Sequence, residues 1–521
     1  MATGTLTGTT IAATYKSILK VKGGANTVLH ATTHQSVEDG DGNDSALSLA
    51  IDSVGITGSG KKLYFSDKDG EYISGDGTDL TITSGRHIVL ALGSAGSVYH
   101  TGDGGSNNAI YGLNAGIALA SGGNQNVLLG EGAGAALTTG EHNTAIGYHT
   151  LFQGTTESDD NVAIGYNSMS GGFTIATVND NVAIGSGSMA GVLTNDADGN
   201  TVIGNAAGAA ITSASKSVLV GGRAGDAITS GIENTALGEA TLSSATIALK
   251  NVAIGSAAMS DVKAAVAVDG CVAIGYGALI GNSNNTTGID GTVAIGKSAL
   301  AALTDGAGNT AVGYQALEDC PGGSGNTAVG YQALNLSIGA FNTAVGYKAL
   351  EDCREDAVQH NTAIGYTAGL NLSTGAYNVA VGSLAMGTGV TTGDNNVAVG
   401  YASLQANTAG ADNVAIGHSA MISPTTAANK NVAIGNNAMG GGWTTADVDG
   451  CVAVGYNALS GVLNVNATGA TAIGYQALVS HTSGAGNTAL GYNAMGSMQT
   501  ANNNTGIGYN ALNASVAADN T

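Results

Sequence analysis

One nine-residue pattern recurs along most of this 521-residue chain. It reads Asn, Thr or Val, Ala, Ile or Val, Gly, often Tyr, any residue, Ala or Ser, and Leu or Met. Its clearest copy, NTAVGYQAL, runs from Asn309 to Leu317 and again from Asn326 to Leu334. Successive motif glycines are 16 to 21 residues apart, most often 17. A short period of this kind predicts a solenoid, in which each copy is one coil.

The motif predicts a short strand followed by a corner. Residues three and one before the glycine lie on one face of a strand, whereas Ala and Asn lie on the other. We expect the larger pair to face the core and the small residues to form the opposite face. Gly313 and Gly330 then turn the chain, because a Cβ would clash there or because φ must be positive. Leu317 and Leu334 supply a second apolar patch. We therefore expect an all-β chain, a parallel β-solenoid of about 22–24 short coils.

Two motif positions allow more than one interpretation. Asn309 and Asn326 can form a ladder of side-chain amides between coils, and Asn also tolerates the backbone of a tight corner. Tyr314 and Tyr331 occupy the position after the glycine, which holds 12 of the 18 tyrosines. Such an aromatic row packs against neighbouring coils or another subunit, or binds sugar. Seven of the nine methionines stand four residues after the glycine, where we expect core filling.

Composition excludes several classes of protein. The net charge is −22, which disfavours nucleic acid and anionic membrane surfaces as partners. With 10% charged residues, 84 Gly and only 2 Pro, the chain is too apolar for a disordered tail and unlike collagen. No run of about 18 apolar residues and no basic, apolar leader occurs, so we expect neither membrane insertion nor a secretion signal.

The four cysteines do not suggest a disulfide framework. Cys320 and Cys353 fill the same slot two coils apart. Coils about 4.8 Å apart would place their Cα atoms roughly 10 Å apart, which is beyond the reach of a disulfide. Cys271 and Cys451 take the place of the motif Asn. We expect all four to be reduced residues that fill a repeat position.

The chain divides into a small N-terminal β-rich domain at residues 1–85 and a solenoid at 86–521. Within the solenoid, wide coils recur in blocks of about five coils, and the sequence from Asn161 aligns without a gap with that from Asn431. Phe173 and Trp443 occupy equivalent wide corners. Long loops on one edge of a solenoid are common binding sites. Phe173 and Trp443 are therefore candidate receptor contacts, with folding back over the coil as the alternative.

These residues resemble two known patterns. NVAIG at Asn161, Asn181 and Asn251 is similar to the coil motif of trimeric adhesin heads, which form a left-handed parallel β-roll. Here the Asn lies one residue nearer the glycine and the coil is longer. Segments 13–21, 39–49 and 70–85 resemble opening segments of phage tail-fibre-like virion proteins. The resemblance implies a homotrimer whose N-terminal region serves attachment or assembly with other virion proteins.

No catalytic, cofactor-binding or metal-binding constellation stands out. Residues 39–44 are similar to a calcium loop, but Asp44 stands where Gly is needed and Ala50 where the bidentate Glu belongs. Carboxylate pairs at 318–319 and 351–352 repeat in one slot, which indicates solvated corners rather than a glycan-cleaving pair. We expect a non-enzymatic structural fibre of a phage virion, assembled in the host cytoplasm, that binds a host surface glycan or protein. The alternatives are an extracellular trimeric adhesin or surface filament and, further off, a polysaccharide-degrading tailspike.

Overall fold

The structure, a computed structural model, describes residues 107–153, 158–172, 178–194, 196–262, 267–281, 288–353, 359–423, 428–443, 448–464 and 466–514, and four strands nearer the N-terminus. Residue contacts divide the chain into two units, Met1–Gly96 and Ser97–Thr521. The expected boundary between residues 85 and 86 lies outside the described residues, as does a faint motif copy at Gly93.

In the first unit, the described strands form one antiparallel sheet in the order β1–β2–β3–β4. They are β1 (Lys20–Val21), β2 (Gln35–Glu38), β3 (Asp44–Leu49) and β4 (Val54–Ile56). The sheet accounts for few of the unit's residues, so an attachment domain at residues 1–85 stays a prediction.

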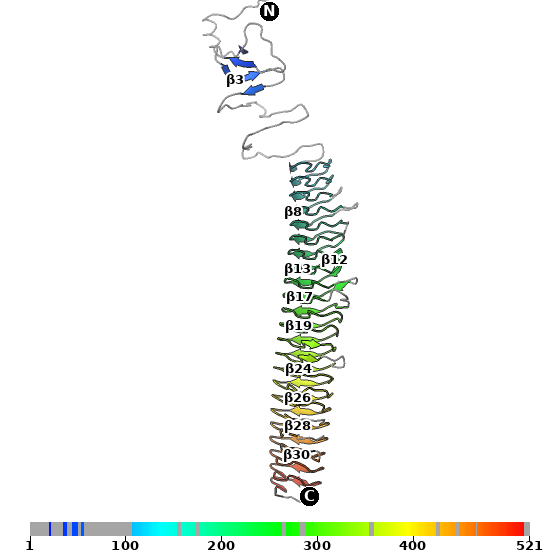
Figure 1. The fold of residues 1–521 in the computed structure, drawn as a ribbon, viewed down its shortest axis with the longest axis vertical. Coiled ribbons are helices and arrows are strands. Elements are labelled where there is room, and N and C mark those ends of the chain that lie inside the picture. Colours follow the sequence, from blue (N-terminus) through cyan, green and yellow to red (C-terminus); the bar gives the residue numbers. More distant parts are fainter. Residues whose placement is uncertain are drawn as a thin grey trace, which may run out of the picture. The chain divides into compact units, whose positions relative to one another are not determined.

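The second unit is a parallel β-solenoid, as the sequence predicted, and its described residues include no helix (Figure 1). Its main sheet contains 23 strands of three residues, each ending just before a motif glycine. The strands are β5 (Ala109–Tyr111), β6 (Val127–Leu129), β7 (Thr144–Ile146), β8 (Val162–Ile164), β9 (Val182–Ile184), β10 (Thr201–Ile203), β11 (Val218–Val220), β13 (Thr235–Leu237), β15 (Val252–Ile254), β17 (Val272–Ile274), β18 (Val293–Ile295), β19 (Thr310–Val312), β20 (Thr327–Val329), β22 (Thr343–Val345), β24 (Thr362–Ile364), β25 (Val379–Val381), β26 (Val397–Val399), β27 (Val414–Ile416), β28 (Val432–Ile434), β29 (Val452–Val454), β30 (Thr471–Ile473), β31 (Thr488–Leu490) and β32 (Thr505–Ile507).

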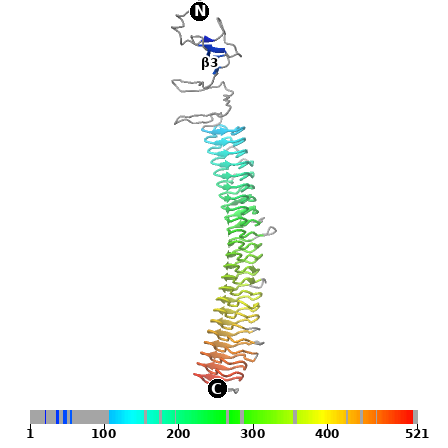
Figure 2. The same cartoon turned by 60° about the vertical axis from the view of Figure 1, so that its left-hand side comes forward.

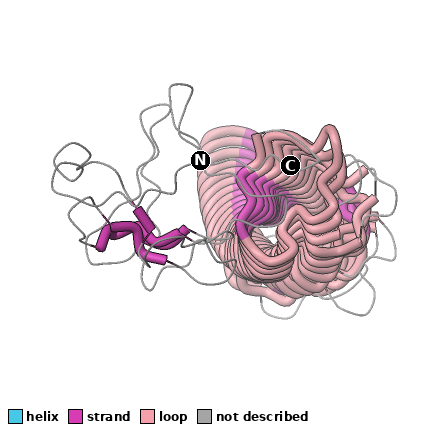
Figure 3. The backbone as a smooth tube through the Cα atoms, turned by 90° about the horizontal axis from the view of Figure 1, so that it is seen from above, coloured by secondary structure: helices cyan, strands magenta, loops and turns pink. Residues whose placement is uncertain are grey.

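Each strand pairs in parallel with the strands of the coils before and after it, without a register shift. Thr310, Ala311 and Val312 of β19, for example, pair with Thr327, Ala328 and Val329 of β20. The sheet therefore runs along one side of the stack (Figure 2), and viewed down the axis its strands superpose in one narrow band (Figure 3). Equivalent residues of successive coils thus form straight rows with a spacing of about 4.8 Å.

Two smaller parallel sheets lie outside the main ladder. One joins β12 (Ser230–Ile232), β14 (Ile247–Leu249) and β16 (Val268–Asp269), and the other joins β21 (Leu336–Ser337) and β23 (Asp352–Cys353). They add strand pairing between neighbouring coils away from the motif strand.

The motif glycine is required for both of the reasons that the sequence suggested. Gly330 has φ of +139°, a region that other residues rarely occupy. A Cβ built on Gly330 would also lie 2.3 Å from the carbonyl oxygen of Gly346 in the next coil. The backbone of one corner therefore packs directly on the backbone of the next.

The two faces of the strand are the reverse of what we expected. Ala311 and Ala328 are fully buried in the core, whereas the flanking Thr310 and Val312 are only half-buried and face outward. The physical reason is the narrowness of the coil. Its interior is filled by Ala, the motif Asn and one long side chain such as Leu317, and no space is left for a second row of branched side chains.

The long core side chain stands in an unusual backbone conformation. Leu317 has φ of +51° and Met169 has φ of +49°, and both are fully buried. A β-branched residue is strongly disfavoured there, which explains why this position is always Leu, Met or Gly. Where it is Gly, as at Gly208, an aliphatic residue three positions later, Ile211, enters the same core space. The expected core role of the methionines is confirmed, because all seven are fully buried.

Candidate functional site

A ladder of buried asparagines runs along the inside of the main sheet. The backbone N–H of Asn326 donates to Oδ1 of Asn309 at 2.9 Å, and that of Asn342 donates to Oδ1 of Asn326 at 2.9 Å. Nδ2 of Asn326 donates to the carbonyl of Gly339 in the next coil at 2.9 Å. The amide-ladder interpretation is thus confirmed. The turn conformation falls instead on the preceding residue, such as Gly325 with φ of +67°.

The asparagine ladder is interrupted where other residues take the motif position. Cys271 donates its N–H to Asn251 Oδ1 at 2.9 Å, but its side chain presents only a thiol to the following coil. In that coil, Thr292 takes the motif Asn position. The Thr292 hydroxyl is buried and has no hydrogen-bond partner. Cys451 and Ala470 form a second such pair. Ser217 also takes the motif position, and its Oγ accepts the N–H of Asn234 at 3.3 Å. Three places in the stack therefore lack the amide bonds of the other coils.

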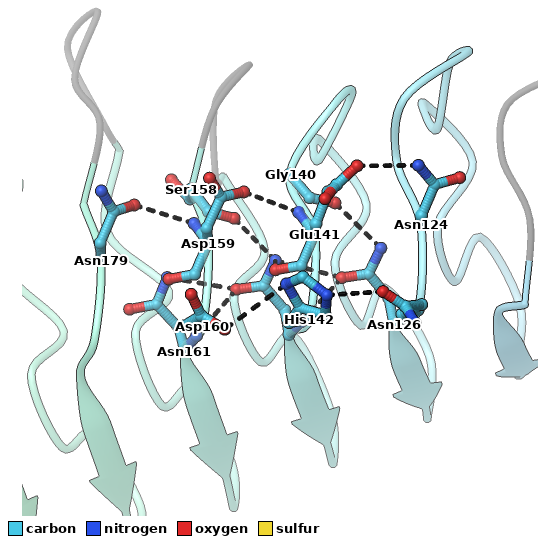
Figure 4. A network of polar contacts seen from close by, with 12 residues as sticks. Asn124, Asn126, Gly140, Glu141, His142, Ser158, Asp159, Asp160, Asn161 and Asn179 are labelled. Atoms are coloured by element: carbon cyan, nitrogen blue, oxygen red, sulfur yellow. Dashed lines mark hydrogen bonds and ion pairs between the residues drawn. The ribbon is translucent and has the colours of Figure 1, made fainter.

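A second polar row, which the sequence reasoning missed, lies two residues before the motif Asn (Figure 4). Backbone N–H groups of Glu141, Asp159 and Asn179 donate to the side chains of Asp159, Asn179 and Asp198 of the following coils, at 2.7, 2.9 and 2.7 Å. Burial raises the pKa of Asp198, and the charges of Asp180 and Asp196 raise it further. The repeated Asp or Asn two residues before the motif Asn was the available signal.

The tyrosines after the motif glycines form the expected aromatic row. Centroids of the rings of Tyr314, Tyr331, Tyr347 and Tyr366 are 5.1–5.3 Å apart, and the rings are within 10° of parallel. Lys297 stands in the same row, with its Nζ 5.8 Å from the ring centroids of Tyr276 and Tyr314. Each inner ring has both faces against its neighbours, so the row presents ring edges and hydroxyls to its surroundings. Packing between coils is therefore shown, and stacking of sugars on these faces is disfavoured.

A shorter aromatic stack stands at the other end of the strand. Phe341, His360 and Tyr377 lie five residues before their motif glycines, with ring centroids 5.2 and 5.1 Å apart. All three have φ of 57–59°. The strand is thus flanked by two edges. We call the residue five before the motif glycine the pre-strand position and the residue after the glycine the post-strand position.

Between these edges, the outward residues of the strands form two continuous rows, which are aliphatic or threonine except at Tyr111. They are half-exposed along the whole sheet, and Ile364 retains 42% of its surface. Neither row contains a charged side chain in any of the 23 strands. Most monomeric proteins do not expose apolar patches of this length. The sequence reasoning missed this surface because it assigned these side chains to the core.

Neither candidate receptor contact is shown to reach the surface. Phe173 lies outside the described residues. Trp443 is only 3% exposed and belongs to the hydrophobic core cluster. Its burial favours the alternative interpretation, in which the ring covers its wide coil, and the receptor role stays a prediction.

The carboxylate pairs at 318–319 and 351–352 form no catalytic arrangement in the described part of the chain. Glu318 accepts a hydrogen bond from Gln315 at 2.8 Å, and Glu351 pairs with Lys348 at 2.7 Å. The side chains of the calcium-like segment, residues 39–44, lie outside the described residues. In the part of the chain that the structure describes, no group of three or more His, Cys, Asp or Glu is placed to hold a metal ion.

The four cysteines are free and buried. Burial raises the pKa of Cys271 and Cys451 to about 11 and that of Cys320 to about 12, and it raises the pKa of Cys353 as well. These thiols are therefore poor nucleophiles at neutral pH.

No helix in the described residues is long and apolar enough to cross a membrane. Comparison of the chain with protein-family models, curated proteins and solved structures gave no match. The geometry of the rows described above is consequently the main basis for a functional assignment.

Proposed function

We propose that this chain is a structural fibre of a phage virion, a tail fibre or similar appendage used for host attachment. The observation that supports it most is the unbroken register from β5 to β32, in which every strand pairs residue for residue with the next. Such a stack is a stiff scaffold whose surface repeats at a constant spacing. Its described residues offer rows of side chains rather than a cleft with converging acids, bases or nucleophiles.

The fibre is a homotrimer in this proposal. One coil buries little apolar surface, because its core holds small residues and one long side chain. The half-exposed rows on the outer face of the sheet supply the contacts that a single chain lacks. A second copy of the chain is the partner that matches those rows in length and in spacing.

The remaining partners follow from the same assignment. The N-terminal region joins other virion proteins, and the wide corners contact a host surface glycan or protein. The location is the virion, after assembly in the host cytoplasm, and the protein has no enzymatic activity. The competing assignment is an extracellular trimeric adhesin or surface filament, and a polysaccharide-degrading tailspike is a third.

Antibodies raised against the purified solenoid test the assignment directly. Immunogold labelling of phage particles from a producing culture should mark an appendage, and the antibodies should reduce adsorption of the particles to host cells. Labelling of filaments on particle-free cells, with unlabelled particles, would overturn the proposal in favour of the adhesin. Release of reducing sugars from host polysaccharide by the purified protein would favour the tailspike instead.

A further inference from the structure

The size of the side chain at the pre-strand position is related to the size of the side chain at the post-strand position of the same coil. In three consecutive coils near the C-terminal end, the pre-strand position is Gly and the post-strand position is Tyr: Gly450 with Tyr456, Gly469 with Tyr475, and Gly486 with Tyr492. Across all 23 coils, Tyr follows the strand in six of the eight coils with a pre-strand Gly, but in only six of the other fifteen. A pre-strand position without a side chain, called the bare edge below, thus tends to occur in a coil with tyrosine at the post-strand position, called the Tyr edge.

Contacts within the chain do not require Gly450 or Gly469, whereas a Cβ on Gly486 would lie 2.8 Å from Oδ1 of Asn503 in the next coil. A Cβ on Gly450 or Gly469 would meet no atom within 4 Å. Their φ values of +67° and +63° differ little from the +59° of Tyr377 and Lys430, which carry large side chains at the same position. The bare edge therefore leaves open space that this chain itself does not fill.

The two edges do not meet within one chain. They lie beyond opposite ends of the strand, and the motif Asn and motif Gly alone are separated by four residues, or about 13 Å at ~3.3 Å per residue. Their matching bulk therefore points to a contact with something else of the same period. The Tyr edge presents a ridge with a 5.0–5.1 Å repeat at Tyr456, Tyr475 and Tyr492. The bare edge has the same repeat, because both belong to one ladder.

We propose that copies of the chain lie side by side, parallel and in register, with the tyrosine edge of each copy against the pre-strand edge of the same coils in its neighbour. This inference rests on the self-association proposed above and specifies which surfaces meet. A cyclic assembly around an axis parallel to the stack brings unlike edges together at equal height. The uncharged rows of the strand face then lie toward that axis, where their apolar groups leave water.

A pair of cysteines tests the contact in the coil of Gly435, where both edges carry exposed side chains. Lys430 and Asn436 hold the pre-strand and post-strand positions there. In the double variant Lys430→Cys/Asn436→Cys, mild oxidation should convert most of the protein into disulfide-linked multimers on a denaturing gel. The native thiols are buried and do not compete. Intramolecular closure is prevented by the separation of the two edges.

Two controls define the register and the pairing of unlike edges. Each single variant should remain uncross-linked, because each thiol would face a different residue of the neighbour. The double variant Lys430→Cys/Ser256→Cys places the second thiol at a post-strand position far along the stack, and it too should remain uncross-linked. Efficient cross-linking of a single variant would show that like edges meet and would overturn the inference.

A second measurement tests the matching of bulk. Gly469→Tyr should weaken association at least tenfold in sedimentation equilibrium, because the new ring would meet the neighbour's Tyr475. Lys430→Tyr is the matched control, since the opposite position is Asn436, and it should leave association unchanged. Equal effects of the two variants would contradict the proposed contact. If the unmodified protein sediments as a monomer, the self-association itself fails; if it is oligomeric but the paired cysteines do not cross-link, only this inference fails.

Discussion

The coils of Gly313, Gly330 and Gly346 differ from those of Gly275 and Gly296 in the residue at the motif Asn position. The first group has Asn at each motif position, and each amide is bonded to the next coil. The second group has Cys271 and Thr292 in those places. Strand register is identical in both groups. Strand pairing and the glycine corner are thus sufficient for the fold, and the amide ladder adds stability to a stack that already has its register.

The largest loss is expected from changing a corner that both groups share. Gly330→Ala places a Cβ against the carbonyl of Gly346 and forces Ala into a φ that only glycine adopts readily. We expect a destabilisation of about 3 kcal/mol or more, measured as a lower midpoint of chemical denaturation. Gly308→Ala is the control, because its Cβ would meet no atom within 4 Å, and its left-handed φ should cost about 1 kcal/mol. Equal losses would refute the close-packed corner.

Breaking the intact ladder should have the next largest effect. Asn326→Ala leaves the N–H of Asn342 and the carbonyl of Gly339 without their partners in the core. The expected cost is about 2–3 kcal/mol. Cys451→Ala, at the same position in an interrupted part of the ladder, removes only a weakly bonding thiol and should cost about 1 kcal/mol. A comparable loss in the two variants would mean that the amide bonds contribute little.

Repairing an interrupted place should raise stability. Thr292→Asn replaces a buried hydroxyl that has no partner with an amide that can bond to the following coil. We expect a gain of about 1 kcal/mol in the free energy of unfolding. Adding Cys271→Asn should give more than the sum of the two single changes, because adjacent amides bond to each other. An additive or unfavourable double variant would contradict this coupling.

The smallest expected effect is a loss of stability as the pH falls. His481 is fully buried, and burial lowers its pKa in the folded chain. Above the unfolded-state pKa of about 6.5 both states are neutral, and as the pH falls below that value only the unfolded state gains the proton. Stability should therefore fall by at most about 0.8 kcal/mol between pH 7.5 and 6. His481→Leu should remove this part of the pH dependence of the melting temperature. If the melting temperature of the variant falls with pH as steeply as that of the unmodified protein, His481 is not the cause.

Much of this architecture could be predicted from the sequence because the motif residues have single physical roles. Gly330 is needed for its backbone, Asn326 for its amide and Tyr331 for its ring, so their spacing predicts the coil, the ladder and the aromatic row. The facing of Val329 could not be predicted from alternation alone. That pattern assumes that the larger side chains enter the core, whereas here Ala328 and Leu334 fill a very narrow one.

Other features lacked a simple signal of this kind. Where Gly208 replaces the usual Leu or Met, Ile211 fills the same core space. This substitution depends on a core volume shared by two positions three residues apart. The scarcity of aromatic residues favours Trp443 as a surface contact, but its ring is buried in the hydrophobic core. The left-handed φ of Leu317 could have been inferred from the absence of Val, Ile and Thr at that position in every copy.

The bonding of each coil to the next also determines how the solenoid should respond to tension. An interior coil is held by two neighbours, whereas a coil at an open end is held by one. A force applied along the chain should therefore peel the stack from an end, one coil after another. Each 17-residue coil would release roughly 55–60 Å of extended chain at ~3.3–3.6 Å per residue. A pulling trace would then show a regular sawtooth, with its weakest teeth at Thr292 and Ala470, where the side chain at the motif position makes no hydrogen bond to the next coil.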